Sequence, residues 1–321
     1  MKQRTLPKLL ASLLLLSGCV DDDAPPPPAP ASYQTEGWGC RDCTFKNSPF
    51  LGFSALEGRS IEHVGYGAKA DPREPRILGA VGPSGRSAPV LFDEGGIGVQ
   101  LDRGRVLREG DLVGWALELQ VPERGVVMLE IDAFDNVPDW TREQHLVPTY
   151  GLSYLHPTGV RTSICPGLEA GETTAVFLHG ERYDLGLPEA VVEVPNGGTI
   201  ACRGHAMAKM KLLGYEPGSP YDTTSAEERA ATLRMITADY CGTGIPHTEI
   251  GTAIDWVDRR GFVPFDGEKT SRVVEARWTA KGATCLDEPR IAGLKAACEL
   301  PRCEGSFDGE VGDATWISLL P

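Results

Sequence analysis

The first eighteen residues constrain the fold of everything that follows, because they decide the compartment in which the chain folds. Three basic residues, Lys2, Arg4 and Lys8, precede a short apolar run from Leu9 to Leu16. A positively charged start followed by a brief apolar run is typical of an export signal, and this run is too short to span a bilayer. The sequence therefore predicts that residues 1–18 are a cleaved signal peptide and that the rest folds in an oxidising compartment.

The signal ends in Leu16-Ser17-Gly18-Cys19, which resembles the lipobox of bacterial lipoproteins. The resemblance implies that the Cys19 thiol is acylated and becomes the first residue of the mature chain. One acyl chain anchors a protein marginally, whereas two or three hold it stably. The alternative is an ordinary signal whose cysteine carries no lipid. We expect a lipid anchor in the cell envelope, at the outer membrane, because Val20 rather than an aspartate follows the cysteine.

Residues 19–35 are predicted to be an acidic and proline-rich tether. Asp21 to Asp23 are followed by Pro25 to Pro28 and then Pro30. Such a segment cannot bury apolar surface and favours an extended conformation. At roughly 3 Å per residue, it could hold a folded domain up to about 50 Å from the membrane.

The charge of the chain narrows the classes of partner. The sequence holds 31 Lys+Arg and 45 Asp+Glu, so loss of the three basic residues of the signal leaves 28 against 45, a net charge of −17. This balance argues against nucleic acid and anionic lipid surfaces as partners. The acidity could attract cations or basic ligands, or it could serve solubility alone.

An odd number of cysteines becomes even once Cys19 is assigned to the lipid. An even set in an oxidising compartment predicts up to four disulfides, among 105 conceivable pairings. Cys40-Arg-Asp-Cys43 could instead be a redox or zinc pair, but no strand precedes it and no second pair has a matching spacing. The eight candidates are Cys40, Cys43, Cys165, Cys202, Cys241, Cys285, Cys298 and Cys303.

Residues 36–195 are predicted to form a β-rich domain. Short apolar segments separated by Gly, Pro and Asp are typical of antiparallel strands, and their number favours a β-sandwich or a small barrel. No repeat of fixed period is evident. The predicted strands are 89–92, 97–101, 112–120, 126–131, 151–155, 175–179 and 191–194.

Residues 196–321 are predicted to be α+β, which makes the whole chain β-rich α+β. Ser225-Ala-Glu-Glu228 has the spacing of a capping box, and the apolar positions after it recur at helical spacing until Gly242. Further helices are predicted over 200–213 and 289–299, and strands over 253–257 and 273–278. Cysteines near the helices could tie them to the strands.

The predicted helix ends in a recognisable motif, Ala238-Asp239-Tyr240-Cys241-Gly242. With Thr243 to Thr248, Ala201 to Met210 and Glu275 to Cys285, it resembles the ADYC-domain lipoproteins of Gram-negative bacteria over roughly residues 195–290. That family has a cysteine where Met210 stands, so Cys298 or Cys303 could replace it in a disulfide. The resemblance implies no activity.

Asp239 is the residue of this motif with the widest choice of roles. A carboxylate in the last turn of a helix is disfavoured by the helix dipole, so a neighbour must offset its charge. The structural alternative is an arginine (Arg234, Arg203 or Arg277) or the amides of the Thr243–Gly244 turn. The catalytic alternative makes Asp239 a metal ligand or general base beside His247 or Asp255.

Other sites have weaker support. The motifs of zinc proteases, serine hydrolases and phosphate-binding loops are absent from the sequence. Asp132, Asp135 and Asp139, with Asn136, could bind calcium, although they lack the spacing of a known loop. The sequence predicts no cofactor.

Our leading hypothesis is a non-enzymatic envelope protein that binds another protein or an envelope component through its β half. The alternatives are an extracytoplasmic hydrolase or transferase and a calcium- or cation-binding module.

Overall fold

Alternation of apolar and polar residues sets the strands of the N-terminal half. In β9 (Ala116–Val121), Leu117, Leu119 and Val121 are buried while the residues between them are half-buried. Successive side chains of a strand point to opposite faces, so this pattern buries one face of the sheet.

The computed structural model describes residues 47–52, 54–67, 70–165, 173–218, 224–264, 272–303, 307 and 309–320. The predicted signal peptide, tether and lipid site at residues 1–35, and also Cys40 and Cys43, lie outside them.

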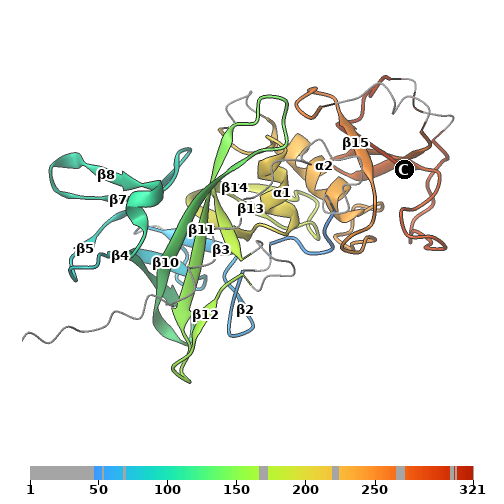
Figure 1. Ribbon diagram of the computed structural model, residues 1–321. Helices are drawn as coiled ribbons and strands as arrows, with labels where there is room; N and C mark the ends of the chain where they lie inside the picture. Colours follow the sequence, from blue (N-terminus) through green and yellow to red (C-terminus); the bar gives the residue numbers. More distant parts are fainter. Residues whose placement is uncertain are drawn as a thin grey trace, which may run out of the picture. The chain divides into compact units, whose positions relative to one another are not determined.

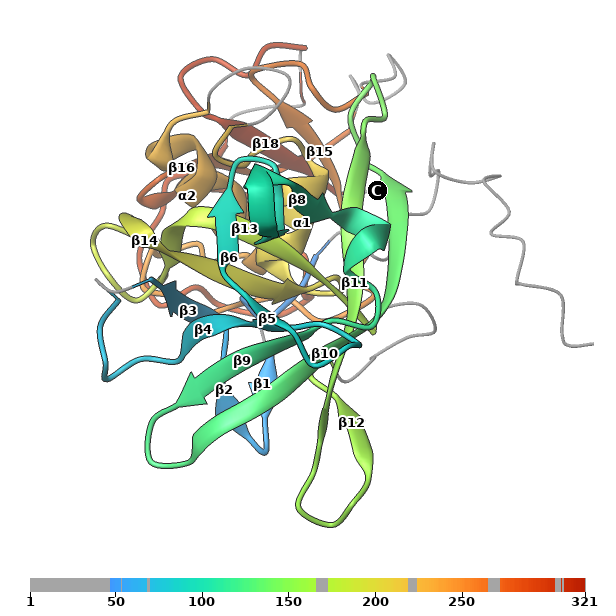
Figure 2. The ribbon, with the colours of Figure 1, turned by 90° about the vertical axis from the view of Figure 1, so that its left-hand side faces the viewer.

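Seven strands close into a barrel, which confirms the predicted small barrel (Figures 1 and 2). Their order is β10-β9-β4-β3-β14-β13-β11, and pairing of β11 with β10 closes the ring. All neighbours are antiparallel except β3 and β4. The strands are β3 (His63–Tyr66), β4 (Arg76–Val81), β9, β10 (Gly125–Pro138), β11 (Leu146–Leu155), β13 (Thr174–Tyr183) and β14 (Val191–Cys202).

Shorter strands surround the barrel. The sheet of β6, β7 and β8 lies nearest the viewer in Figure 2, and its buried Phe92 joins the same apolar cluster as the barrel interior. The strands are β1 (Ala55–Leu56), β2 (Arg59–Ser60), β5 (Ser87–Ala88), β6 (Val90–Asp93), β7 (Gly96–Gln100), β8 (Val106–Arg108) and β12 (Arg161–Ser163). The 3₁₀ turns η1 (Asp102–Gly104) and η2 (Glu109–Leu112) flank β8.

Two apolar clusters use opposite faces of the same strands. One gathers the inward residues of the barrel, such as Leu119, Ile131 and Phe177. The other packs outward residues of β13 and β14, such as Val176, against the helices. α1 (Ala206–Leu212) and α2 (Ala226–Thr237) lie between those strands and the C-terminal sheet (Figure 1).

The C-terminal sheet has the order β15-β18-β16-β17. Two of its buried tryptophans donate their indole N–H groups to neighbouring hydroxyls, as buried indole N–H groups usually do. Trp316 donates to Thr232 of α2 at 2.8 Å, and Trp278 donates to Ser318 at 2.7 Å. The first bond fixes the sheet to the helix. The strands are β15 (Asp255–Asp258), β16 (Val274–Thr279), β17 (Gly282–Leu286) and β18 (Trp316–Leu319).

Two predicted helices need correction. The helix predicted over 200–213 begins only at Ala206, because residues up to Cys202 continue β14 in its pairing with β13. The helix predicted over 289–299 is wrong, since the structure has no helix there. Gly293 takes a left-handed φ of 78°, which interrupts helical geometry. The predicted boundary after residue 195 falls inside β14.

Three disulfides join described cysteines: Cys165–Cys202, Cys241–Cys298 and Cys285–Cys303. Their Cα–Cα distances of 5.4, 5.7 and 4.9 Å lie in the usual range for a disulfide. The first links β14 to the chain after β12, and the other two attach residues 298–303 to the C-terminal sheet and to the end of α2. Among the helices that the structure describes, none has the length and apolar character needed to cross a membrane.

Candidate functional site

The helix before the signature motif ends earlier than its sequence predicts. α2 begins with the predicted capping box, in which Ser225 accepts from the Glu228 N–H and Glu228 accepts from the Ser225 N–H. It ends at Thr237 rather than Gly242, because Ala238 turns left-handed at φ 53° and ψ 42°. The Asp239 N–H then donates to the Arg234 carbonyl at 2.9 Å, which closes a Schellman motif. Asp239 therefore lies past the helix end.

The Asp239 carboxylate is fully buried and satisfied. It pairs with the Arg234 guanidinium, and it accepts from the Thr243 and Gly244 N–H groups, each at 2.9 Å. Arg234 also donates to the carbonyls of Ala280 (2.7 Å) and Leu185 (3.2 Å). These are the partners that the structural alternative for Asp239 required, and they join α2 to three separate loops.

Tyr240, the next residue of the motif, is also buried and bonded to distant parts of the chain. Its hydroxyl donates to Glu275 at 2.6 Å, and its ring stacks on Trp278 with centroids 5.3 Å apart. The Arg290 guanidinium donates two hydrogen bonds to the same carboxylate, from Nε to Oε1 and from Nη2 to Oε2, each at 2.8 Å. Burial alone would raise the pKa of Glu275, but the Arg290 guanidinium and the surrounding hydrogen bonds hold it below its ordinary value. Burial raises the pKa of Tyr240, and the negative charge of Glu275 raises it further.

The last residues of the motif are also structural. Cys241 forms the disulfide to Cys298. Gly242, at φ 67°, has the Lys281 carbonyl 2.1 Å from where a Cβ would stand, so only glycine fits this close approach. The motif thus forms a packed joint between α2, the β16–β17 turn and the chain around residue 298.

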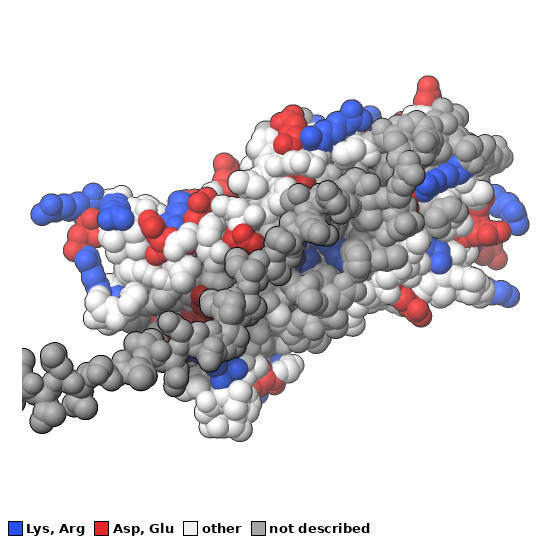
Figure 3. Space-filling model, in the orientation of Figure 1, with Lys and Arg blue, Asp and Glu red and all other residues white. Residues whose placement is uncertain are grey.

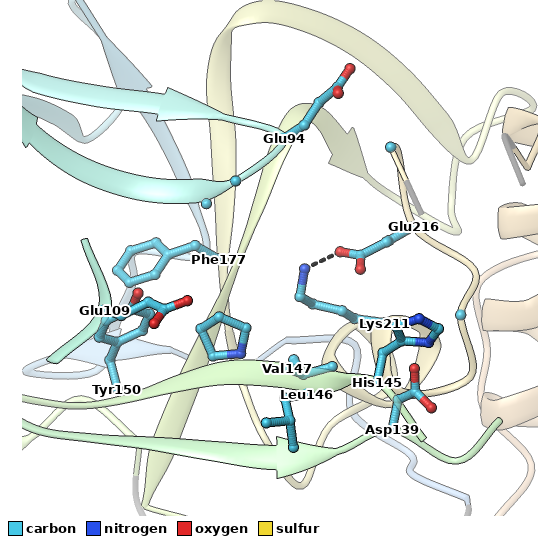
Figure 4. A pocket seen from close by; sticks show the side chains of 15 residues that line it. Glu94, Glu109, Asp139, His145, Leu146, Val147, Tyr150, Phe177, Lys211 and Glu216 are labelled. Atoms are coloured by element: carbon cyan, nitrogen blue, oxygen red, sulfur yellow. Dashed lines mark hydrogen bonds and ion pairs between the residues drawn. The ribbon is translucent and has the colours of Figure 1, made fainter. Parts of the chain in front are cut away.

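A pocket of about 310 Å³ lies elsewhere, between the barrel and α1 (Figure 4). The β6–β7 turn contributes Glu94, Gly95 and Gly96, β11 and the chain before it contribute His145 to Pro148 and Tyr150, and the end of α1 contributes Lys211. Phe177 of β13, Gly214, Glu216 and Gly218 also line the pocket, together with Glu109 and Asp139. Tyr150 and Phe177 both belong to the barrel interior, with ring centroids 5.3 Å apart, so the floor of the pocket is the rim of the apolar core.

The charged groups of the pocket are mostly acidic. Figure 4 shows the Lys211 side chain directed into the middle of the pocket, where it pairs with Glu216. Both are largely buried, at 11% and 14% exposure of the side chain. Burial raises the pKa of Glu216, and Lys211 opposes this shift. Glu94, Glu109 and Asp139 also line the pocket, so carboxylates outnumber the one ammonium group. Burial raises the pKa of Tyr150 to about 12 and keeps its hydroxyl neutral.

The comparisons with known proteins give one match. A sequence model of the ADYC domain covers residues 109–292, more than half of the chain. The chain belongs to the ADYC domain family. The match begins in η2 and runs through the barrel strands β9 to β14 as well as the signature motif, so the ADYC domain spans both predicted halves. No curated protein and no solved structure matches the chain.

The fold of this chain does not bring the proposed catalytic residues together. His247 packs its ring against Tyr240, and its Nδ1 lies 3.1 Å from the Ala238 carbonyl oxygen. Asp255, in β15, pairs with Arg272. Within the described residues, no hydrogen bond or ion pair joins Asp239 to either of them.

The proposed calcium ligands are likewise separated. Asp132 and Asp135 lie within β10, which continues past the predicted strand end at residue 131, and Asp132 pairs with Arg161 at 3.0 Å. Asp139 is buried and accepts two bonds from Thr141. Among the described residues no cluster of three or more His, Cys, Asp or Glu side chains could hold a metal ion.

Lys211 and Glu216 were missed by the sequence reasoning. A lone Lys and Glu five residues apart match no motif. The available signal was a lysine in the last turn of a predicted helix and a glutamate shortly after the helix end, in otherwise apolar surroundings.

Proposed function

We propose that this ADYC protein is a lipid-anchored, non-enzymatic binding protein of the bacterial cell envelope. Its export, acylation at Cys19 and outer-membrane location are supported by the residues of the lipobox and by the three disulfides, which suit an oxidising compartment. A binding role is supported by the state of the signature motif, whose polar groups are all committed to structural bonds. The site we assign to binding is the pocket between the barrel and α1.

The shape and charge of the pocket carry the proposal. Its floor is apolar and aromatic, whereas its walls place several carboxylates around one ammonium group that Glu216 already neutralises. Ligand sites commonly combine an apolar lining with a few placed polar groups. An excess of negative charge in a concave, partly desolvated site favours a cationic group on the ligand. The pocket therefore suits an apolar body bearing an amine or guanidine, such as a basic side chain of an envelope peptide.

Two leucines on one strand offer a matched test. Leu146 lines the pocket at the start of β11, and Leu155 ends the same strand away from it. They are exposed to nearly the same extent, 63% and 64%, so tryptophan at either position should leave the core intact. Leu146→Trp would fill the entrance of the pocket, and Leu155→Trp would not.

The experiment titrates the two variants and the wild type with an acetylated, amidated Phe-Lys dipeptide by calorimetry. We expect Leu146→Trp to weaken binding by roughly tenfold or more, the equivalent of about 1.4 kcal/mol, and Leu155→Trp to bind like the wild type. Equal binding by both variants would show that the pocket is not the site. Labelling with a radioactive fatty acid, with Cys19→Ser as the control, tests the anchor separately.

A further inference from the structure

A second cleft, distinct from the acidic pocket, lies beside the C-terminal sheet. Its volume is about 480 Å³. Arg142, from the chain after β10, lines the cleft together with Arg259 and Arg260, which directly follow β15, and with the segment from Gly309 to Gly312. Segments more than a hundred residues apart in the sequence thus contribute three arginines to the lining of one cleft.

Two of these arginines have no acidic partner within the part of the chain that the structure describes. Most arginines that the structure describes sit in ion pairs, as expected where acidic residues outnumber basic ones. On the face drawn in Figure 3, Lys/Arg and Asp/Glu are correspondingly interspersed. Arg142 and Arg259 are exposed, and neither guanidinium has a hydrogen bond or ion pair among the described residues. Arg260, by contrast, is held by Glu228 at 2.7 and 2.9 Å.

The backbone that carries the two arginines is fixed. The Arg142 N–H donates to the Phe262 carbonyl at 2.8 Å, and the Arg259 N–H donates to the Thr315 carbonyl at 2.9 Å. The turn after Arg259 is held by the buried carboxylate of Asp258, which accepts from the N–H groups of Phe262 and Val263 at 2.9 and 3.1 Å. A ligand would therefore meet guanidinium groups on a preformed frame.

From this convergence we infer that the cleft binds an oxyanion, a carboxylate or phosphate group of a small ligand, between Arg142 and Arg259. Planar guanidinium groups suit both anions because they can donate two parallel hydrogen bonds. Two acidic residues also line the cleft. Asp258 is occupied by its backbone donors and by the Tyr215 hydroxyl at 3.1 Å, and Glu310 is exposed. The negative charge of Glu310 repels anions. A simple inorganic anion held only by long-range attraction should therefore bind weakly, whereas an anion that forms hydrogen bonds with both arginines should bind more tightly.

The test titrates the purified full-length chain with citrate and with inorganic phosphate at constant ionic strength, by calorimetry. We compare Arg142→Gln/Arg259→Gln with Arg59→Gln/Arg103→Gln, which removes the same two charges from exposed positions outside the cleft. Loss of charge-assisted hydrogen bonds should weaken binding by roughly tenfold or more in the first variant, and the second should bind like the wild type. Saturable binding of citrate alone would assign a carboxylate ligand, and of phosphate alone a phosphate ligand.

Absence of saturable binding by both probes, or equal loss in both double variants, would overturn the inference. The Leu146→Trp variant separates this site from the proposed pocket, because it should bind both anions normally. A negative result for one proposed site therefore does not contradict the proposal for the other.

Discussion

Replacing Asp239 with Asn should destabilise the protein strongly, because the change removes one charge of a buried pair. Arg234 and Asp239 are exposed by only 1% and 0%. Asparagine keeps one acceptor oxygen, so it cannot serve the Thr243 and Gly244 amides and Arg234 together, and its own NH₂ group would face a donor. Breaking a buried ion pair from one side costs about 3–5 kcal/mol.

That cost is a large part of a typical stability of about 5–15 kcal/mol. Urea unfolding followed by tryptophan fluorescence should therefore show a midpoint lowered by on the order of 1 M. The control is Asp71→Asn, the same chemical change at an exposed pair with Arg73 at 2.7 Å. Because water screens that pair, its midpoint should not move. If Asp239→Asn unfolds together with Asp71→Asn, the assignment of Asp239 as a structural anchor is wrong.

Two further predictions concern the joint around the motif. Replacing Cys241 and Cys298 together with serine should lower stability by about 2–4 kcal/mol, since the disulfide closes a loop of 57 residues; an unchanged thermal midpoint would contradict this. The lowered pKa of Glu275 means that its contribution is complete above its ordinary pKa and is lost as the pH falls through the lower value in the folded state. Glu275→Gln should be less stable at pH 7 and lose less stability than the wild type between pH 5 and pH 2, measured by urea unfolding.

Local signals predicted the parts of the fold that depend on local interactions. The capping box at Ser225 is present as its spacing indicates, because both of its bonds lie within one turn. The predicted strand segments are also present, because alternation is a property of each segment alone, although the strand predicted over 112–120 begins only at Ala116 because Leu112 belongs to η2. The closure of the barrel by β10 and β11 needs pairing between strands, so the sequence could offer only a sandwich or barrel.

The errors arose where distant partners decide the local structure. The apolar spacing of residues 289–299 suits a helix, but Arg290 turns inward to Glu275 and Cys298 bonds to Cys241. The early end of α2 has a similar origin. Ala238 accepts a left-handed conformation, unfavourable by roughly 1–2 kcal/mol for a non-glycine residue, and this places Asp239 beside Arg234 rather than on the helix. Neither partner is visible in the local pattern.

The contrast between the motif and the pocket bears on where function lies in this ADYC protein. Asp239, Tyr240 and Cys241 are committed to an arginine, a carboxylate and a disulfide, so substitutions there should act through folding. The pocket instead holds polar groups at the rim of an apolar core, and its walls come from turns and strand ends that tolerate change more readily. Residues such as Glu109 could vary without loss of the barrel. We therefore expect ligand preference to be set by the pocket, while the motif preserves the frame that positions it.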